Sequence, residues 1–446
     1  MVIKKIIYKI SIYKVLPPYK NWYSIMTNDG LNRSNVVIIG KKQLLKVALA
    51  LIVMAIFNKR NTIDKFNSHI MGSYGRLNVV LDKGEDDKAV DENGKTYIDF
   101  GSGIGTNSLG YCNKEWADAV CEQVRSIQHT SNYYYTKVQA EFAERLSEAA
   151  GMKNMFLCNS GAEANECAIK IARKYSFDKY GKGRHNIITL VNSFHGRTLC
   201  TLSATGQDVF HNYFFPFVDG FINVEANNIE DLKAKLDDTV CAVMFEYIQG
   251  EGGVVPLEQK FVDAIFELCA ERDVLTISDE VQTGVGRTGK FLAGDNFGKK
   301  ADIITLAKGI AGGIPMGACL SGDKCAGVLT PGTHGSTFGG NPIACAGAIE
   351  VLKKAADPIF LSQVADKGRY IAEKLKEIPE VESVTGMGLM IGIKLKTKNA
   401  KDILNAALEH GLLILTAKEK LRLLPPLTIS YEDIDRGLEI LAELLK

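Results

Sequence analysis

The sequence contains no apolar run long enough to span a membrane and no clear export signal. Its apolar run at residues 47–57 has eleven residues, whereas a spanning helix needs about 20. Asn58, Lys59 and Arg60 follow this run, where a signal peptide would carry small residues at its cleavage site. We therefore expect no membrane association and a cytoplasmic location.

Patterns typical of metal sites and disulfide frameworks are also missing. The ten cysteines are scattered between Cys112 and Cys345 without a CxxC pair, and no histidine spacing typical of zinc sites accompanies them. Reduced, mostly buried thiols are the expected state of such cysteines in a cytosolic protein. We therefore predict no metal site.

The chain carries little net charge, but that charge is unevenly distributed. Residues 1–60 hold eleven Lys or Arg and a single acid, Asp29, so residues 61–446 carry −9 against +1 for the whole chain. A mildly acidic body argues against nucleic acid as a partner, because neutralising phosphates requires a basic surface. The opening residues also lack the helical or strand periodicity of the rest. We interpret residues 1–60 as an atypical, non-essential N-terminal extension.

From about Met71 the chain has the pattern of an α/β domain. Short β-branched runs alternate with amphipathic stretches, which predicts a largely parallel sheet. The clearest predicted strands are 186–191, 240–247, 274–278 and 302–306. Ligands gather at the carboxyl ends of strands in such sheets, so the residues that follow these runs are the candidates for chemistry.

The later part of the chain predicts a second, smaller domain. A helix over 341–353 and strands near 388–395 and 412–415 belong to it. We expect the chain before about Glu115 to pack with these elements. The predicted units are residues 61–114 and 336–446 for the small domain and 115–335 for the large domain.

Three features of the large domain carry chemistry. Ser160, Gly161 and Ala162 lie between a predicted strand and a predicted helix, so their N–H groups would face an anion at the helix N-terminus. Asp279 ends the apolar run VLTIS, and a buried carboxylate needs a cationic partner. Lys308 ends IITLA before a glycine-rich loop, where a desolvated amine can form a Schiff base. Each feature alone has a structural explanation, such as a helix cap or a solvated lysine, but together they indicate a phosphorylated pyridine cofactor.

These residues lie in motifs that resemble a known family. The motifs are NSGAEANECAIKIAR, SFHGRT, QGEGG, SDEVQTGVGRTGKF, TLAKGIAGGIPMGA, HGSTFGGNP and LRLLPPL. They resemble the class III, or omega, aminotransferases and among these the acetylornithine aminotransferases, over about residues 61–446. The resemblance implies fold type I of the pyridoxal-phosphate-dependent transferases. This is an α/β large domain with a mainly parallel seven-stranded sheet, plus a smaller α+β domain built from the N- and C-terminal segments.

The resemblance also implies the cofactor pyridoxal 5'-phosphate, held by Lys308 as a Schiff base. Asp279 would bind the pyridine nitrogen and keep the ring an electron sink. Phe194 would stack on the ring. The other implied cofactor contacts are Ser160, Gly161, Ala162, Glu280, Val281, Gln282 and, from the neighbouring subunit of a homodimer, Thr337.

Two arginines are implied in substrate binding, because a planar guanidinium suits a carboxylate. Arg197 matches the arginine that receives the substrate carboxylate, and Arg422 the one for the second carboxylate of 2-oxoglutarate or glutamate. Glu251 matches the acid that pairs with Arg422 when a cationic or neutral substrate is present. The other implied substrate contacts are Ser336, Asn132 and Tyr133.

The implied reaction moves the terminal amino group of N2-acetyl-L-ornithine to 2-oxoglutarate, a step of arginine biosynthesis that gives N-acetylglutamate 5-semialdehyde and glutamate. Succinyldiaminopimelate, ornithine and 4-aminobutyrate aminotransferases share the cofactor set and remain alternatives. An aminomutase or racemase would need no external keto acid, so Arg422 and Glu251 argue against it. A cofactor-free regulatory relative is disfavoured, because Lys308, Asp279 and the phosphate turn are all intact.

Overall fold

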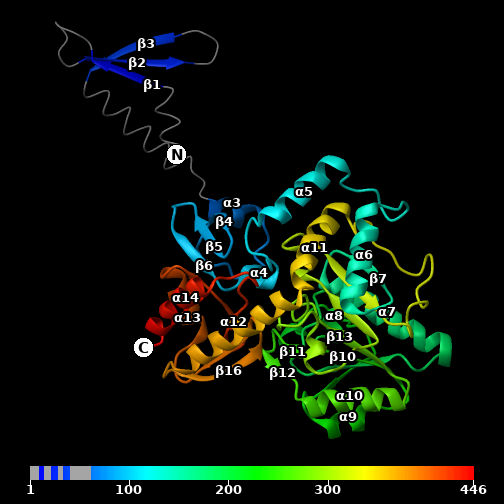
Figure 1. Ribbon diagram of the computed structural model, residues 1–446. Coiled ribbons are helices and arrows are strands. Elements are labelled where there is room, and N and C mark those ends of the chain that lie inside the picture. Colours follow the sequence, from blue (N-terminus) through cyan, green and yellow to red (C-terminus); the bar gives the residue numbers. More distant parts are fainter. Residues whose placement is uncertain (1–9, 15–21, 29–33, 41–61) are drawn as a thin grey trace. The chain divides into compact units, whose positions relative to one another are not determined.

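The computed structural model describes residues 10–14, 22–28, 34–40 and 62–446, and its chain divides into two compact units, residues 1–80 and 81–446 (Figure 1). The elements of the first unit are β1 (Ile10–Lys14), β2 (Trp22–Asn28), β3 (Ser34–Gly40) and α3 (Thr62–His69). The first three form an antiparallel sheet in the order β1-β2-β3. We had predicted no strands in this segment, because its sequence lacks strand periodicity, yet three strands form there. The apolar run at 47–57 lies outside the described residues.

The second unit is built around a seven-stranded sheet. Its order is β7-β15-β14-β13-β10-β8-β9, and β15 is the one strand antiparallel to its neighbours. The strands are β7 (Asn154–Cys158), β8 (Asn186–Leu190), β9 (Phe221–Val224), β10 (Val240–Phe245), β13 (Leu275–Asp279), β14 (Ile303–Leu306) and β15 (Gly317–Ser321). The mainly parallel sheet is confirmed, and the four predicted strands lie within two residues of the observed ones.

Helices cover both faces of this sheet, so its strands are apolar on both sides. On β14, Ile303 packs in the core under α7, whereas Ile304 packs in the core with α6 and α11 on the opposite face. The helices are α5 (Lys114–Ser126), α6 (Lys137–Ala150), α7 (Gly161–Tyr180), α8 (Leu199–Ala204), α9 (Ile229–Lys235), α10 (Gln259–Glu271) and α11 (Pro342–Ala355). The short elements between them are η1 (Asp208–Phe210), β11 (Ile248–Gln249), β12 (Val255–Pro256), η2 (Ala293–Asn296) and η3 (Lys308–Ala311).

A smaller α+β part joins the two ends of the second unit. Leu412 pairs in parallel with Ile98, which brings the red and orange C-terminal elements beside residues 81–99 of the same unit (Figure 1). Its two four-stranded sheets have the orders β18-β6-β5-β4 and β16-β17-β20-β19. The elements are β4 (Leu81–Glu85), β5 (Lys88–Asp91), β6 (Thr96–Asp99), α4 (Ser102–Gly105), α12 (Pro358–Lys376), β16 (Val381–Met387), β17 (Met390–Leu395), α13 (Ala400–Glu409), β18 (Leu412–Leu413), β19 (Leu415–Ala417), β20 (Lys420–Leu423) and α14 (Tyr431–Leu444). The prediction that N- and C-terminal segments build the small domain together is confirmed. The helix predicted there over 341–353 is instead α11, which packs with α5 and α6 on the large sheet, so its assignment to the small domain was wrong.

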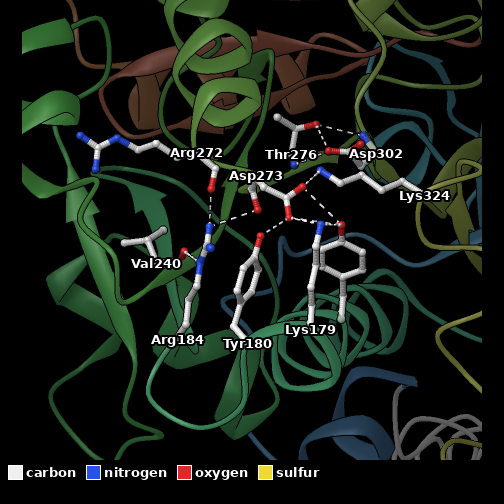
Figure 2. A network of polar contacts seen from close by, with 10 residues as sticks. Lys179, Tyr180, Arg184, Val240, Arg272, Asp273, Thr276, Asp302 and Lys324 are labelled. Atoms are coloured by element: carbon white, nitrogen blue, oxygen red, sulfur yellow. Dashed lines mark hydrogen bonds and ion pairs between the residues drawn. The ribbon is translucent and has the colours of Figure 1, made fainter.

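A polar network fixes the C-terminal end of α7 to the sheet (Figure 2). Asp273, in the turn between α10 and β13, accepts contacts from Lys179 at 2.7 Å, Lys324 at 2.9 Å and the Tyr180 hydroxyl. Burial raises the pKa of Asp273, but the hydrogen bonds from Lys179, Tyr180 and Lys324 outweigh it and hold the pKa below its ordinary value of 3.8. The carboxylate therefore stabilises the folded state above that pH, and this contribution is lost as the pH falls below it.

We expect Asp273→Asn to lower the free energy of unfolding by about 1–2 kcal/mol at pH 7, since solvent screening keeps each ion pair weak. Asparagine tolerates the left-handed backbone at this position, φ 50°, so the loss reports the charge. Urea unfolding of both proteins at pH 7 and at pH values below 4 checks this, because the difference should shrink in acid. Equal stability at pH 7 would show that the network contributes nothing.

Candidate active site

A cavity of about 430 Å³ lies where the carboxyl ends of the central strands meet the N-terminus of α7. Gly161 opens α7, Asp279 is the last residue of β13, and Lys308 follows β14. All three line this cavity. The three features that the sequence analysis selected are thus brought together, although 147 positions of chain separate the first from the last.

Asp279 is held at the floor of the cavity by three donors. Its Oδ2 accepts from Asn165 Nδ2 at 2.8 Å and lies 2.8 Å from His195 Nδ1, which must donate because a carboxylate only accepts. Its Oδ1 accepts from the Val281 N–H at 3.0 Å. These contacts fix the orientation of a carboxylate that is only 4% exposed, as a group that pairs with one atom of a ligand requires.

Lys308 stands in a left-handed backbone conformation, φ 46°, at the first residue of η3. A residue other than glycine held there costs on the order of 1–3 kcal/mol, and such strain is common at functional sites. Burial lowers the pKa of the amine, against the opposite influence of Glu251. A larger neutral fraction makes the amine a better nucleophile.

The N-terminus of α7 forms the anion end of the cavity. Ser160 caps the helix, its hydroxyl accepting from the Glu163 N–H at 3.2 Å, and the following N–H groups are left for a ligand. A side chain at Gly161 would meet Val281 Cγ1 at 2.7 Å. Glycine at this position therefore lets the helix N-terminus approach Val281 and Asp279 closely.

An ion pair lies behind another wall, which Glu251 and Gln282 line. Arg422 Nη1 donates to Glu251 Oε1 at 2.6 Å and to Gln282 Oε1 at 3.2 Å. Burial raises the pKa of Glu251, but the Arg422 guanidinium outweighs it and leaves that pKa below its ordinary value. Arg422 is 3% exposed, so its charge depends on this partner or on an incoming anion that replaces it.

Two more predicted residues line the cavity, Phe194 and Arg197. The Arg197 guanidinium lies 5.4 Å from the centre of the Phe194 ring and 4.1 Å from that of Phe210. Guanidinium groups stack favourably on aromatic rings. The arginine is therefore supported at the rim while its hydrogen-bond donors remain available.

Other predicted residues lie outside the cavity. Glu280 accepts from the Ala293 and Gly294 N–H groups, so its carboxylate supports a loop. Asn132 Nδ2 donates to the carbonyl oxygen of Ser336 at 3.1 Å, and Tyr133 is 92% exposed. The predicted contacts that do not line the cavity within this chain are Asn132, Tyr133, Glu280, Ser336, Thr337 and Arg422.

The sequence analysis missed the residues that support Asp279. Asn165 Oδ1 accepts from Thr305 on β14, and His195, which is 2% exposed, lines the cavity together with Asn165. Glu246 is buried nearby, accepts from the Phe194 N–H at 2.9 Å, and has a pKa raised to about 7 by burial. The available signal was spacing, because Asn165 stands four residues after Gly161 and so on the same side of α7.

These residues fit pyridoxal phosphate. The helix N-terminus suits its phosphate, the oriented carboxylate of Asp279 suits a protonated pyridine nitrogen, and the Lys308 amine suits its aldehyde. The volume of about 430 Å³ is in the range of small-molecule sites. Within the described residues no group of metal-ligating side chains is found, and no helix there is both long and apolar enough to span a membrane.

Comparisons with known proteins agree with this site. The class III aminotransferase family model matches residues 71–445. The acetylornithine aminotransferase of Haemophilus ducreyi is 48% identical over 380 residues, which are 85% of this chain and 96% of that protein. The acetylornithine aminotransferase of Methanocaldococcus jannaschii is 42% identical over 86% of this chain and 98% of that protein.

Solved structures give the same result. The ornithine aminotransferase of Toxoplasma gondii has a TM-score of 0.83 at 30% identity, covering 88% of this chain and 97% of that one. The N-acetylornithine aminotransferase of Stenotrophomonas maltophilia has a TM-score of 0.74 at 34% identity, covering 83% and 96%. A further Toxoplasma gondii structure is described with partial occupancy of pyridoxal phosphate at its active site. The chain therefore belongs to the class III aminotransferases and is a pyridoxal-phosphate-dependent transaminase of fold type I.

Proposed function

We propose that this transaminase moves the terminal amino group of N2-acetyl-L-ornithine to 2-oxoglutarate, in the cytoplasm, as a step of arginine biosynthesis. The observation that carries the proposal is the pair of buried Arg422 and half-buried Glu251 beside Lys308. While Arg422 is paired with Glu251, the pair has no net charge and suits an acylated amino donor. When the pair opens, the free guanidinium can bind a dicarboxylate. The names of the relatives, 41–48% identical over about 85% of this chain, support the choice of donor.

The proposed residue roles follow from the contacts. When bound, pyridoxal phosphate supplies an electron-withdrawing ring that stabilises negative charge on the substrate carbon. Lys308 Nζ, whose pKa burial lowers, accepts the proton from that carbon and returns it. Asp279, oriented by Asn165 and His195, keeps the pyridine nitrogen protonated.

We also propose that the enzyme is a homodimer with shared active sites. Asn132 holds the segment that carries Ser336 and Thr337 through its bonds to the carbonyl oxygens of Ser336 and Gly339, yet none of these lines the cavity of their own chain. Tyr133, Tyr134 and Tyr135 beside them are 70–104% exposed, which indicates a surface that a second copy covers.

A substrate comparison tests the function. Turnover of acetylornithine, succinylornithine, ornithine and 4-aminobutyrate with 2-oxoglutarate is measured, with glutamate and the aldehyde product identified by mass. Acetylornithine should give the highest kcat/KM. Ornithine is the sharpest competitor, because ornithine aminotransferases are among the similar structures. No activity on any acylated diamine would contradict the proposal. The same screen on a chain starting at residue 61 should give equal turnover if residues 1–60 are non-essential, as we propose.

We expect Arg422→Gln to separate the two half-reactions. Losing the guanidinium should reduce kcat/KM for 2-oxoglutarate by about 10²- to 10³-fold, as loss of a buried charge pair does, and reduce that for the acylated donor by no more than about tenfold. Single-turnover absorbance changes with each substrate measure the two effects. Arg436→Gln, on the exposed side of α14, is the matched control. Equal losses in both half-reactions would contradict the proposed exchange of partners.

A further inference from the structure

A second cavity, of about 620 Å³, lies at the C-terminal end of α7, away from the active-site lining. It is bounded by the last turns of α7, the loop that leads to β8, and residues Leu329 and Thr333 from the segment after β15. We call this cavity the basic pocket, because its lining includes Lys170, Arg173, Lys174, Lys182, Arg184 and His185. Among the described residues that line it, none is acidic.

Most of this positive charge is not neutralised by the protein. Lys174 pairs with Asp178 on its own helix, but within residues 62–446 no carboxylate lies at ion-pair distance from the other lining cations. Arg173 Nη2 donates to the Asp219 carbonyl oxygen at 2.8 Å, and its buried Nε has no hydrogen-bond partner among the described residues. A buried guanidinium N–H without an acceptor is costly, so the protein compensates the charge of Arg173 poorly.

The network of Figure 2 fixes Arg184 in place without cancelling its charge. Arg184 Nε donates to the Val240 carbonyl oxygen at 3.0 Å, and Nη2 donates to those of Arg272 and Asp273. The Tyr180 ring supports the guanidinium at 4.3 Å. The nearby carboxylate of Asp273 is already taken by Lys179 and Lys324. One wall of the basic pocket is therefore rigid and positively charged.

The loop at the pocket carries a further cation. Gly181 and Gly183, at φ 77° and 107°, flank Lys182, and these left-handed positions favour glycine. A side chain added at either glycine would meet nothing within 4 Å, so the loop leaves space around Lys182. The lining also includes Phe177, which is 55% exposed and offers an aromatic face.

These observations indicate a multiply charged ligand with a flat apolar part. The volume is in the range of small-molecule sites. The cations suit phosphate oxygens. Among the described residues Arg184 Nη1 has no hydrogen-bond partner, and Lys182 has no ion-pair partner, so both can donate to a phosphate. Phe177 suits a ring that stacks on it. We propose that the basic pocket binds an organic polyphosphate of nucleotide size, with its phosphates on Arg173, Lys182 and Arg184 and its base against Phe177.

Direct binding to the full, cofactor-loaded chain tests this proposal, because loading fills the phosphate position of the active site. The probe is ATP without magnesium, titrated calorimetrically at low ionic strength. We expect one ATP per chain, weaker binding of pyrophosphate and no heat from adenosine. A tenfold rise in salt should weaken the binding, since screening acts on exposed charges.

Two charge reversals locate the site. Lys182→Glu should lower the affinity for ATP by about tenfold or more, because an anion replaces a cation beside the phosphates. Lys153→Glu, a matched exposed lysine in the turn before β7, should leave the affinity within about twofold. Absence of ATP binding overturns the proposal. So does ATP binding that Lys182→Glu leaves unchanged or that both variants weaken equally. Thermal unfolding of the variants confirms that they are folded.

Discussion

Replacing Lys308 by alanine is expected to reduce the rate of amino-group transfer by at least about 10⁴-fold. The reduction combines the loss of a nucleophile with the loss of the group that moves the proton, and proton transfer alone typically contributes about 10²- to 10⁴-fold. No other lysine lines the cavity, so no other amine among the described residues is placed to act as the nucleophile or to move the proton. Initial rates of glutamate formation, at saturating concentrations of both substrates, measure the effect.

The control for this variant is Lys300→Ala. Lys300 precedes β14 and Lys308 follows it, so the two lysines stand at opposite ends of one strand. We expect Lys300→Ala to keep the native rate within about twofold, because Lys300 is exposed and distant from the cavity lining. A Lys308→Ala enzyme that still works within tenfold of the native rate would contradict the assigned role of Lys308.

Changing Asp279 to asparagine is expected to lower kcat by about 10³-fold while leaving the fold intact. Asparagine has nearly the same shape, but it carries no charge to keep a pyridine nitrogen protonated, and each pKa unit of that nitrogen corresponds to about 1.4 kcal/mol. The donors Asn165 and His195 both face Asp279 Oδ2, so an amide would also disturb this network. The pH profile of kcat should change shape as well, because the ring nitrogen becomes free to titrate.

Asp302→Asn is the matched control. Asp302 stands just before β14, whereas Asp279 is the last residue of the parallel strand β13, so the two lie at opposite ends of these strands. Asp302 Oδ2 accepts from the Thr276 N–H at 2.9 Å and from the hydroxyl at 3.0 Å. We expect this change to lower the midpoint of thermal unfolding with kcat within about twofold of the native value. Similar losses of kcat in both variants would mean that Asp279 acts through stability alone.

The fold could be predicted where the sequence has clear local patterns. The runs that became β10, β13 and β14 are short and apolar, and each is followed by a polar or glycine-containing turn. Asp279 and Lys308 could therefore be placed at strand ends. The strands β1 to β3 were missed because WYSIMTN and SNVVIIG lack alternation and ISIYK has only five residues, and their pairing depends on contacts between strands.

The supporting part of the site could not be predicted, because it depends on distant residues meeting in the fold. Asn165 and His195 reach Asp279 across 114 and 84 positions of chain. The basic pocket has the same origin. Lys170, Arg173 and Lys174 appear in the sequence as charges on a helix, and Lys182 and Arg184 as charges in the loop after it. Solvated charges of this kind are common. Only the segment around Leu329 makes them the lining of a cavity.

The left-handed backbone at Lys308 has an evolutionary consequence. If folding alone selected the residue, glycine would be preferred at this position, because it adopts φ 46° freely. Selection for turnover keeps a side chain there that the loop itself disfavours. A lineage that lost the activity would be expected to drift towards glycine at position 308 and to become more heat-resistant as it did so.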